Sequence, residues 1–196
     1  MRYPGPAMVA PEPPDATIFT QRLALRPLTL ETVVALLESR PRSAIETIVG
    51  AELPWTWPSR ALVDQVFPAS LEAISADPAS RLWGDRLMIT REGPARVVGS
   101  ILFHGRPGAD GVAEVAYGVE DASQGQGYAT EALAPCIAWA LAQEECRVVR
   151  ATTTPWHRAS KRLLEKVGMT KVAERREDGA EMWVYEIGRD AAPAAR

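Results

Sequence analysis

Apolar and polar side chains alternate along residues 20–28, which is the pattern of a strand that buries one face. Runs rich in β-branched and aromatic residues, separated by turns with glycine and proline, recur further along the chain. They predict strands over 86–91, 96–104, Val112–Val119, 147–153, 170–174 and 181–187. The last two are joined across Asp178-Gly179, a dipeptide that favours a tight hairpin turn.

Other segments place their apolar residues at helical spacing. Thr29 is a candidate N-cap for the short helix that follows it, and a longer helix is predicted over 59–76, interrupted or kinked by Pro68. Trp55 and Trp57 precede this longer helix, where they either wall a substrate pocket or cover the edge of the core.

Two further helices are predicted in the second half of the chain. One follows Gly127 and carries Leu133 and Ile137 on its apolar face. The other is expected to begin at Thr154, with a proline in its first turn, and to stop at Gly168 in a left-handed conformation.

The composition predicts a single domain over 17–188 between two loose ends. A chain of 196 residues can build one domain with a sizeable core, and 46% apolar with 24% charged residues is typical of a soluble globular protein. Residues 1–16 are rich in proline and are predicted to form a disordered arm. Residues 189–196 are predicted to form a loose tail.

Charge and cysteine content indicate which kinds of partner, and which cellular compartment, to expect. A net charge of −3 gives no basic surplus for nucleic acid, and no apolar run approaches a membrane span or a signal-peptide core. Cys136 and Cys146 have neither a metal-ligand spacing nor a disulfide framework, so free thiols and no metal site are expected. We therefore expect a cytoplasmic protein that contacts neither nucleic acid nor membrane.

Residues 124–129 stand where a predicted strand passes into a predicted helix. Gly125 and Gly127 leave the backbone uncrowded, so several consecutive N–H groups can point at one ligand. A helix N-terminus has unpaired N–H groups and about half a positive charge, which suits phosphate. The stretch predicts a pyrophosphate cradle.

Two common phosphate-binding motifs do not fit this loop. The dinucleotide fingerprint needs a third glycine at the position of Thr130, and the phosphate loop of nucleotide hydrolases needs a lysine, which the stretch lacks. What remains is Gln-x-x-Gly-x-Ala, formed by Gln124, Gly127 and Ala129 and followed by Thr-Glu-Ala.

This motif resembles the coenzyme-A pyrophosphate loop of the GNAT acetyltransferases. Thr-x-Arg-Leu-x-Leu-Arg-Pro-Leu over 20–28 resembles the opening strand of the RimJ/RimL branch of that family. The segment from Ser160 to Met169 is similar to the family's Asn-x-x-Ser-x-x-x-Leu-Glu-Lys-x-Gly-Phe, with His157 in place of Asn and Met169 in place of Phe. The three signatures occur in the family's order.

The resemblance implies an α/β (α+β) GNAT fold: a mixed, mostly antiparallel sheet of about six or seven strands, flanked by about four helices and splayed where the cofactor enters. It also implies an acetyl-CoA-dependent N-acetyltransferase that acts on a primary amine by direct attack in a ternary complex. The acceptor is left open between a protein N-terminal α-amine and a small-molecule amine. Dimers are common in this branch, although no stretch of the sequence marks an interface.

The same resemblance assigns the cofactor-binding residues. Backbone N–H groups of the loop would hold the pyrophosphate, the Thr130 hydroxyl would add a donor, and the strand around Val119 would pair with the pantetheine amides and offer an N–H to the oxyanion. His157 would either donate a hydrogen bond to the pantetheine arm or cap its helix. The expected set is Val119, Gln124, Gly125, Gln126, Gly127, Tyr128, Ala129, Thr130, His157 and Ser160.

Glu114 is the predicted general base. It lies in Glu-Val-Ala-Tyr, which resembles the branch's Glu-Ile-Gly-Tyr, and a carboxylate there could take a proton directly or through a water. Strand alternation places Glu114 on the face opposite Tyr117 and Val119. The alternatives are a solvent-facing glutamate without a catalytic role, and His104 as a rival base that the surrounding turn residues disfavour.

Ser160 is the predicted general acid, which would hydrogen-bond the departing sulfur. Many GNAT enzymes use a tyrosine four residues later, but that position holds Leu164, which cannot donate a proton. Tyr117 is an alternative acid, and Ser160 could instead bond the backbone of its own helix.

Two other functions remain open at this point. The departures at His157 and Leu164 keep open a GNAT fold that binds CoA or acyl-CoA for regulation and has lost its chemistry. An enzyme that uses the glycine loop for a dinucleotide is disfavoured by the missing third glycine and by the lack of an acid near the next strand end.

Overall fold

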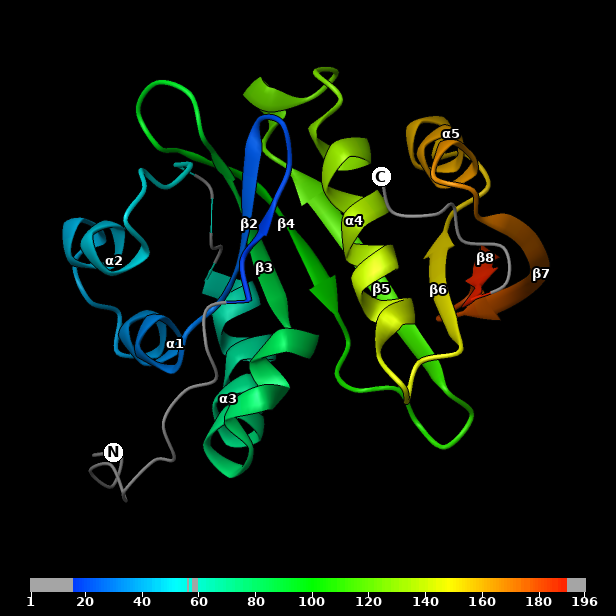
Figure 1. The fold of residues 1–196 in the computed structure, drawn as a ribbon, viewed down its shortest axis with the longest axis horizontal. Coiled ribbons are helices and arrows are strands. Elements are labelled where there is room, and N and C mark those ends of the chain that lie inside the picture. The colour runs from blue at the N-terminus through cyan, green and yellow to red at the C-terminus, as the bar shows by residue number, and fades with distance from the viewer. Residues whose placement is uncertain (1–15, 56, 58–59, 190–196) are drawn as a thin grey trace.

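Eight strands form one sheet in the order β1-β2-β3-β4-β5-β6-β8-β7 (Figure 1). The computed structural model describes residues 16–55, 57 and 60–189. Neighbouring strands are antiparallel except β5 and β6, which run parallel. The strands are β1 (Ile18–Phe19), β2 (Leu23–Pro27), β3 (Asp85–Thr90), β4 (Val97–Phe103), β5 (Val112–Val119), β6 (Val148–Thr153), β7 (Thr170–Glu177) and β8 (Ala180–Gly188).

Helices cover both faces of this sheet (Figure 1). α4 packs on one face, where Leu133 and Ile137 share a core with Val115 of β5. α1, α2 and α3 surround a second core on the opposite face. The helices of the described residues are α1 (Leu30–Leu37), α2 (Arg42–Val49), α3 (Arg60–Ala76), α4 (Tyr128–Ala142) and α5 (Arg158–Lys166), with short 3-10 helices η1 (Pro78–Trp83) and η2 (Asp121–Ser123).

Strand β3 contributes side chains to both cores, because successive residues point to opposite faces of the sheet. Leu87 and Ile89 belong to the core under α1–α3, whereas Met88 between them belongs to the core under α4. All three side chains are nearly inaccessible to solvent, because successive side chains of a strand point to opposite faces and both faces are covered here.

Strands β5 and β6 separate part-way along their length. Their pairing ends at Glu114↔Arg150. Beyond that point β5 continues to Val119 paired with β4, and β6 continues to Thr153 paired with β8. Within the described residues, β5 and β6 are therefore no longer paired with each other over this stretch. The splay implied by the resemblance is present, and Glu114 lies at its closed end.

Several local predictions are confirmed. The Thr29 hydroxyl accepts a hydrogen bond from the N–H of Thr32 and caps α1. Gly168 has φ of +91° just after α5, and Asp178 and Gly179 both have positive φ in the turn between β7 and β8. These signals are local, so the sequence was sufficient to predict them.

Two short elements, β1 and α2, were not predicted. The described residues therefore contain eight strands, where six or seven were expected, and five α-helices, where four were expected. β1 has two residues and carries no readable alternation. α2 buries only Ile45 and Val49, and Pro41 at its N-cap position makes no side-chain cap bond. It therefore lacks the usual start signal.

The predicted start of α5 is wrong. Thr154 accepts a hydrogen bond from the N–H of His157 in a turn, and the helix begins only at Arg158 with His157 as its N-cap. The side chain of His157, rather than that of Thr154, accepts from the first-turn N–H of Ser160.

The predicted arm and tail lie outside the described residues, apart from Ala16 and Arg189. All strands between Ile18 and Gly188 belong to one sheet, which supports our proposal that 17–188 is a single domain.

Candidate active site

The glycine loop connects the end of β5 to the first turn of α4. Gly125 and Gly127 have left-handed φ of +73° and +85°, and Gly127 is the N-cap residue of α4. A Cβ at Gly125 would meet no atom within 4 Å, so the space over the loop is open to a ligand. Because first-turn N–H groups have no partner within their helix, those of Tyr128, Ala129 and Thr130 can bind an anion there.

Two glutamine side chains hold the loop in this shape. Gln124 Nε2 donates to the carbonyl of Val119 at 3.1 Å and to Asp121 Oδ1 at 2.9 Å. Gln126 Nε2 donates to the carbonyl of Ala122 at 3.3 Å. The side chains thus point back into the loop. The backbone N–H of Gln124 also donates within the loop, to the carbonyl of Asp121 at 3.2 Å, so the predicted contact of this N–H with a pyrophosphate is not available in this conformation.

Thr20 and Arg22, in the turn between β1 and β2, fix the first turn of α4. The Glu131 carboxylate accepts from the Thr20 hydroxyl at 2.6 Å and from the N–H of Arg22 at 2.8 Å, and it forms an ion pair with the Arg22 guanidinium at 2.6 Å. Burial raises the pKa of Glu131, but the hydrogen bonds from Thr20 and Arg22 outweigh this, so the net pKa is lowered. Arg22 also donates to the carbonyl of Gln126 at 3.1 Å.

A cleft of about 650 Å³ lies between the end of β5, the first turn of α4 and α5. Of the predicted cofactor-binding residues, Gln126 does not line it. Those that do are Val119, Gln124, Gly125, Gly127, Tyr128, Ala129, Thr130, His157 and Ser160. One cleft therefore brings together two signatures that are separated in the sequence.

Ser160 and Tyr117, which were alternatives for the general acid, lie in direct contact. Tyr117 Oη and Ser160 Oγ are 2.7 Å apart, and both residues line the cleft. Burial raises the pKa of Tyr117, with the Ser160 hydrogen bond acting in the opposite direction, so the phenol keeps its proton at neutral pH. Leu164, at the position of the usual tyrosine, is fully buried in the core.

Glu114 lies at the closed end of the splay but does not line the cleft. As alternation predicted, its side chain is on the sheet face opposite Tyr117. Glu114 Oε1 is 3.9 Å from a guanidinium nitrogen of Arg150 and equally far from one of Arg175. An acceptor that contacts Glu114 must approach from the face opposite the cleft.

Residues 22–170 match the family model of the acetyltransferase (GNAT) domain. The chain belongs to the GNAT acetyltransferases. The Bacillus subtilis N-acetyltransferase YjdG is 24% identical over 161 residues, which cover 81% of this chain and 94% of YjdG.

Two solved structures share the fold of this GNAT acetyltransferase. The ribosomal-protein-S5-alanine acetyltransferase of Vibrio fischeri has a TM-score of 0.66 at 14% identity, over 91% of this chain and 100% of that one. Mycobacterium smegmatis RimJ, in complex with CoA-disulfide, has a TM-score of 0.62 at 20% identity, over 93% of this chain and 91% of that one.

The predictions of a GNAT fold, an acetyltransferase and acetyl-CoA as cofactor are thereby confirmed. The loop of this GNAT domain fits the cofactor, because its open space over Gly125 and its first-turn N–H groups are what a pyrophosphate needs. The roles of individual residues remain predictions.

The sequence reasoning missed two cations of this GNAT cleft. Arg162 and Lys166 line it from α5, on the same helix face as Ala159 and Leu163. Positions three and four apart share a helix face, so the spacing from Ala159 was a signal that could have found them. Their charges suit the phosphate groups of CoA.

His157 serves the site as a helix cap. Its Nδ1 accepts from the N–H of Ser160 at 3.0 Å, which leaves the proton of the neutral ring on Nε2. The residue also lines the cleft, so Nε2 can donate to a bound ligand. Of the two roles expected for His157, the structure shows the helix cap. The contact with pantetheine remains a prediction.

His104 is exposed, and its N–H donates to the backbone carbonyl of Glu114 at 3.0 Å. It does not line the cleft. Within the described residues, no group of His, Cys, Asp and Glu is placed to hold a metal ion, and no helix is long and apolar enough to cross a bilayer. Cys136 and Cys146 are both buried and free.

Proposed function

We propose that this enzyme transfers the acetyl group of acetyl-CoA directly to a primary amine in a ternary complex. The observation that carries the proposal is the splay between β5 and β6. Glu114 lies at its closed end on one sheet face, while the glycine loop, Tyr117 and Ser160 line the cleft on the other. Donor and acceptor can therefore meet at this point from opposite faces.

Acetyl-CoA supplies the acetyl group as a thioester. First-turn N–H groups of α4 bind the pyrophosphate, with Arg162 and Lys166 at the rim of the cleft. The backbone around Val119 runs along the splay and offers its N–H groups to the pantetheine amides and to the developing oxyanion.

Glu114 accepts the first proton of the acceptor ammonium, directly or through a water, so that the nitrogen can form the new C–N bond. When the C–S bond breaks, the sulfur takes a proton from the Ser160 hydroxyl. Tyr117, at 2.7 Å, replaces that proton. The second proton lost by the nitrogen restores the hydroxyl pair, so one proton is released per turnover.

The acceptor belongs to one of two classes, a protein N-terminal α-amine or a small-molecule amine. The opening strand over 20–28 and the fold shared with Mycobacterium smegmatis RimJ support the RimJ/RimL-like branch. The buried free thiols suit the reducing cytoplasm that we propose as its location. A homodimer is proposed from the resemblance to this branch alone, and neither nucleic acid nor membrane is proposed as a partner.

The test measures release of the CoA thiol with a panel of N-terminal peptides and small amines. We expect turnover by the wild type, and a loss of about 10- to 100-fold in kcat for both Ser160→Ala and Tyr117→Phe. The double variant should lose little more than the more damaging single variant, because the two hydroxyls act in one relay. Melting temperature and acetyl-CoA affinity serve as controls for folding and binding.

The alternative function, a CoA-binding module without chemistry, is motivated by Leu164 in place of the usual tyrosine. Tight acetyl-CoA binding without turnover of any amine in the panel would support this alternative and contradict direct transfer.

A further inference from the structure

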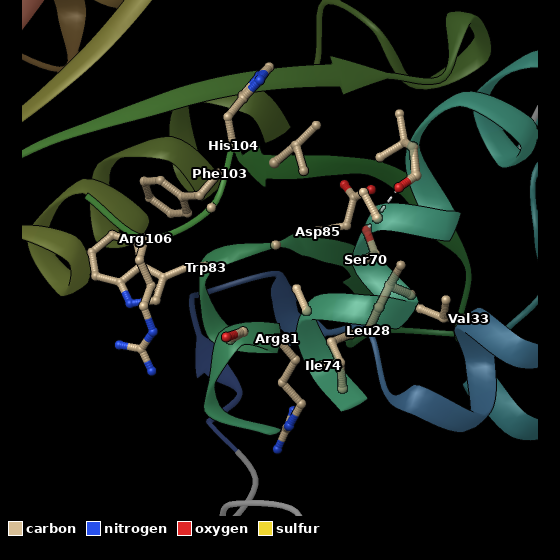
Figure 2. Close-up of a pocket in the computed structure, with 17 residues that line it drawn as sticks. Leu28, Val33, Ser70, Ile74, Arg81, Trp83, Asp85, Phe103, His104 and Arg106 are labelled. Atoms are coloured by element: carbon tan, nitrogen blue, oxygen red, sulfur yellow. Dashed lines mark hydrogen bonds between the residues drawn. The ribbon is translucent and has the colours of Figure 1, made fainter. Parts of the chain in front are cut away.

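A second cavity, of about 590 Å³, lies between α3, η1 and the adjoining ends of β3 and β4 (Figure 2). It shares no lining residue with the cofactor cleft. Most of its wall is apolar, including Leu28, Val33, Ile74, Trp83 and Phe103. A cavity of this size can hold a small molecule. The steps of acetyl transfer proposed above place no molecule in it.

Two charged side chains of this wall are buried, those of Asp85 and Arg81, and Asp85 is the acidic one. Only 7% of the residue is exposed, and Figure 2 shows its carboxylate pointing toward α3, where Ser70 lies. It accepts a hydrogen bond from the Ser100 hydroxyl. The neighbouring Arg86 lies on the opposite face of the sheet, where its guanidinium stacks 4.3 Å from the Trp139 ring centroid.

No cation of the described residues pairs with Asp85. Arg106 is bound to Asp77 at 2.8 Å and to Glu145 at 3.0 Å. In Figure 2 the Arg81 and Arg106 guanidinium groups and the His104 ring point away from the Asp85 carboxylate. Burial raises the pKa of Asp85 to about 6, so the group is still mostly ionised at neutral pH. A buried carboxylate without a cation is costly, and a cationic ligand would remove that cost.

The cavity lies on the same sheet face as Glu114. Asp85 pairs with Leu102 of β4, and Leu102 pairs with Ala116 of β5, so the three side chains form one row on this face. Glu114 is two residues from Ala116 and shares its side of β5. Because neighbouring strands are about 4.8 Å apart, the backbones of β3 and β5 are separated by roughly 10 Å.

We propose that this cavity binds the acceptor, and that Asp85 binds a second cationic nitrogen in it, so that the preferred acceptors are diamines. The primary amine to be acetylated would lie near Glu114. An apolar chain would cross the cavity, and the second ammonium or guanidinium group would pair with Asp85. This inference rests on the proposed acetyl transfer and specifies the acceptor.

The test compares hexamethylenediamine with hexylamine, which has the same chain but lacks the second nitrogen. In the wild type, kcat/KM for the diamine should exceed that for the monoamine at least about 10-fold, as expected for a buried charge-assisted hydrogen bond. Asp85→Asn keeps the size and the hydrogen-bonding capacity toward Ser100, and should bring this ratio close to one. Ala73→Trp, on the α3 wall, should raise KM for the diamine by obstructing the cavity.

Two further measurements separate failure of this inference from failure of the proposed function. Acetyl-CoA affinity should be the same in the wild type and in Asp85→Asn, because the cavity and the cleft share no residue. Direct titration of hexamethylenediamine should show binding by the wild type that is weakened at least about 10-fold in Asp85→Asn, whether or not turnover occurs.

Equal use of the diamine and the monoamine by the wild type, or an unchanged ratio in Asp85→Asn, would overturn the role of Asp85 and leave acetyl transfer intact. Preference for an N-terminal peptide without a second cation over the diamine would overturn it as well. Absence of turnover together with Asp85-dependent diamine binding would overturn the proposed function and keep the cation site.

Discussion

Glu114→Gln is expected to lower kcat for acetyl transfer about 100- to 1,000-fold, since an amide cannot take the proton of the acceptor ammonium. Acetyl-CoA affinity should not change, because Glu114 does not line the cofactor cleft. Stability should fall by less than about 1 kcal/mol, since the Glu114 side chain is 41% exposed and its ion pairs with Arg150 and Arg175 are 3.9 Å long. Single-turnover kinetics at saturating acetyl-CoA would measure the loss.

Glu186→Gln is the matched control. Glu186 pairs with the same Arg150 at 2.6 Å, so this variant disturbs the ion-pair network without removing the proposed base. It should retain most of the wild-type kcat. Similar losses in both variants would mean that Glu114 acts through the ion pairs, and full activity of Glu114→Gln would remove it from the mechanism.

Asp85→Asn is expected to stabilise the protein at neutral pH. Burial raises the folded-state pKa of Asp85 to about 6 from an ordinary 3.8, so the folded state holds its proton more tightly than the unfolded state. The ionised group therefore destabilises the fold progressively as pH rises from about 4 to about 6, and fully above that range, by roughly 3 kcal/mol. Removing the charge should raise the Tm at pH 7.5 by roughly 5 to 10 °C.

The pH dependence identifies the cause of this effect. At pH 4 Asp85 is protonated in the folded state, so Asp85→Asn and the wild type should melt at nearly the same temperature. Asp77→Asn is a control of opposite sign, because the pKa of exposed Asp77 is lowered, chiefly by the hydrogen bond from the N–H of Ala79 and by that from Arg106. It should be destabilising near pH 7 and neutral at low pH. A gain in Asp85→Asn that is independent of pH would contradict the account.

Because the ionised Asp85 destabilises the fold, we attribute its presence to a role in binding the acceptor. The stability expected from Asp85→Asn and the selectivity expected to be lost with it are two consequences of one buried charge. Measured together, they test whether Asp85 is present for the acceptor rather than for the fold.

Much of the fold was predictable because its signals are local. The alternation of apolar and polar residues predicted the bounds of β5 and the position of Glu114 on the face opposite Tyr117. Gly125 and Gly127 adopt the left-handed φ values that glycine permits. The resemblance added the splay, which no periodicity encodes. The start of α5 was missed because Thr154 and His157 can both cap a helix, and only the folded backbone shows which of them does.

The parts of the site that could not be predicted depend on contacts between distant segments. Tyr117 and Ser160 are 43 residues apart, and Arg22 and Glu131 are 109 apart, so neither pair follows from spacing. The cation site is a further case: Asp85 lies in β3, but Ser70 and Ile74 of its cavity come from α3, and no spacing in the sequence relates the two elements.

Calorimetric titration with acetyl-CoA, and with NAD as comparison, tests the central claim most directly when the wild type is measured beside Gly127→Val. Gly127 has φ of +85°, which a β-branched residue adopts only with strain, so the variant should distort the cradle. The account predicts that the wild type binds one acetyl-CoA per chain and no NAD, with acetyl-CoA affinity at least about 10-fold weaker in Gly127→Val. Binding of NAD instead, or equal acetyl-CoA affinity in both proteins, would contradict it.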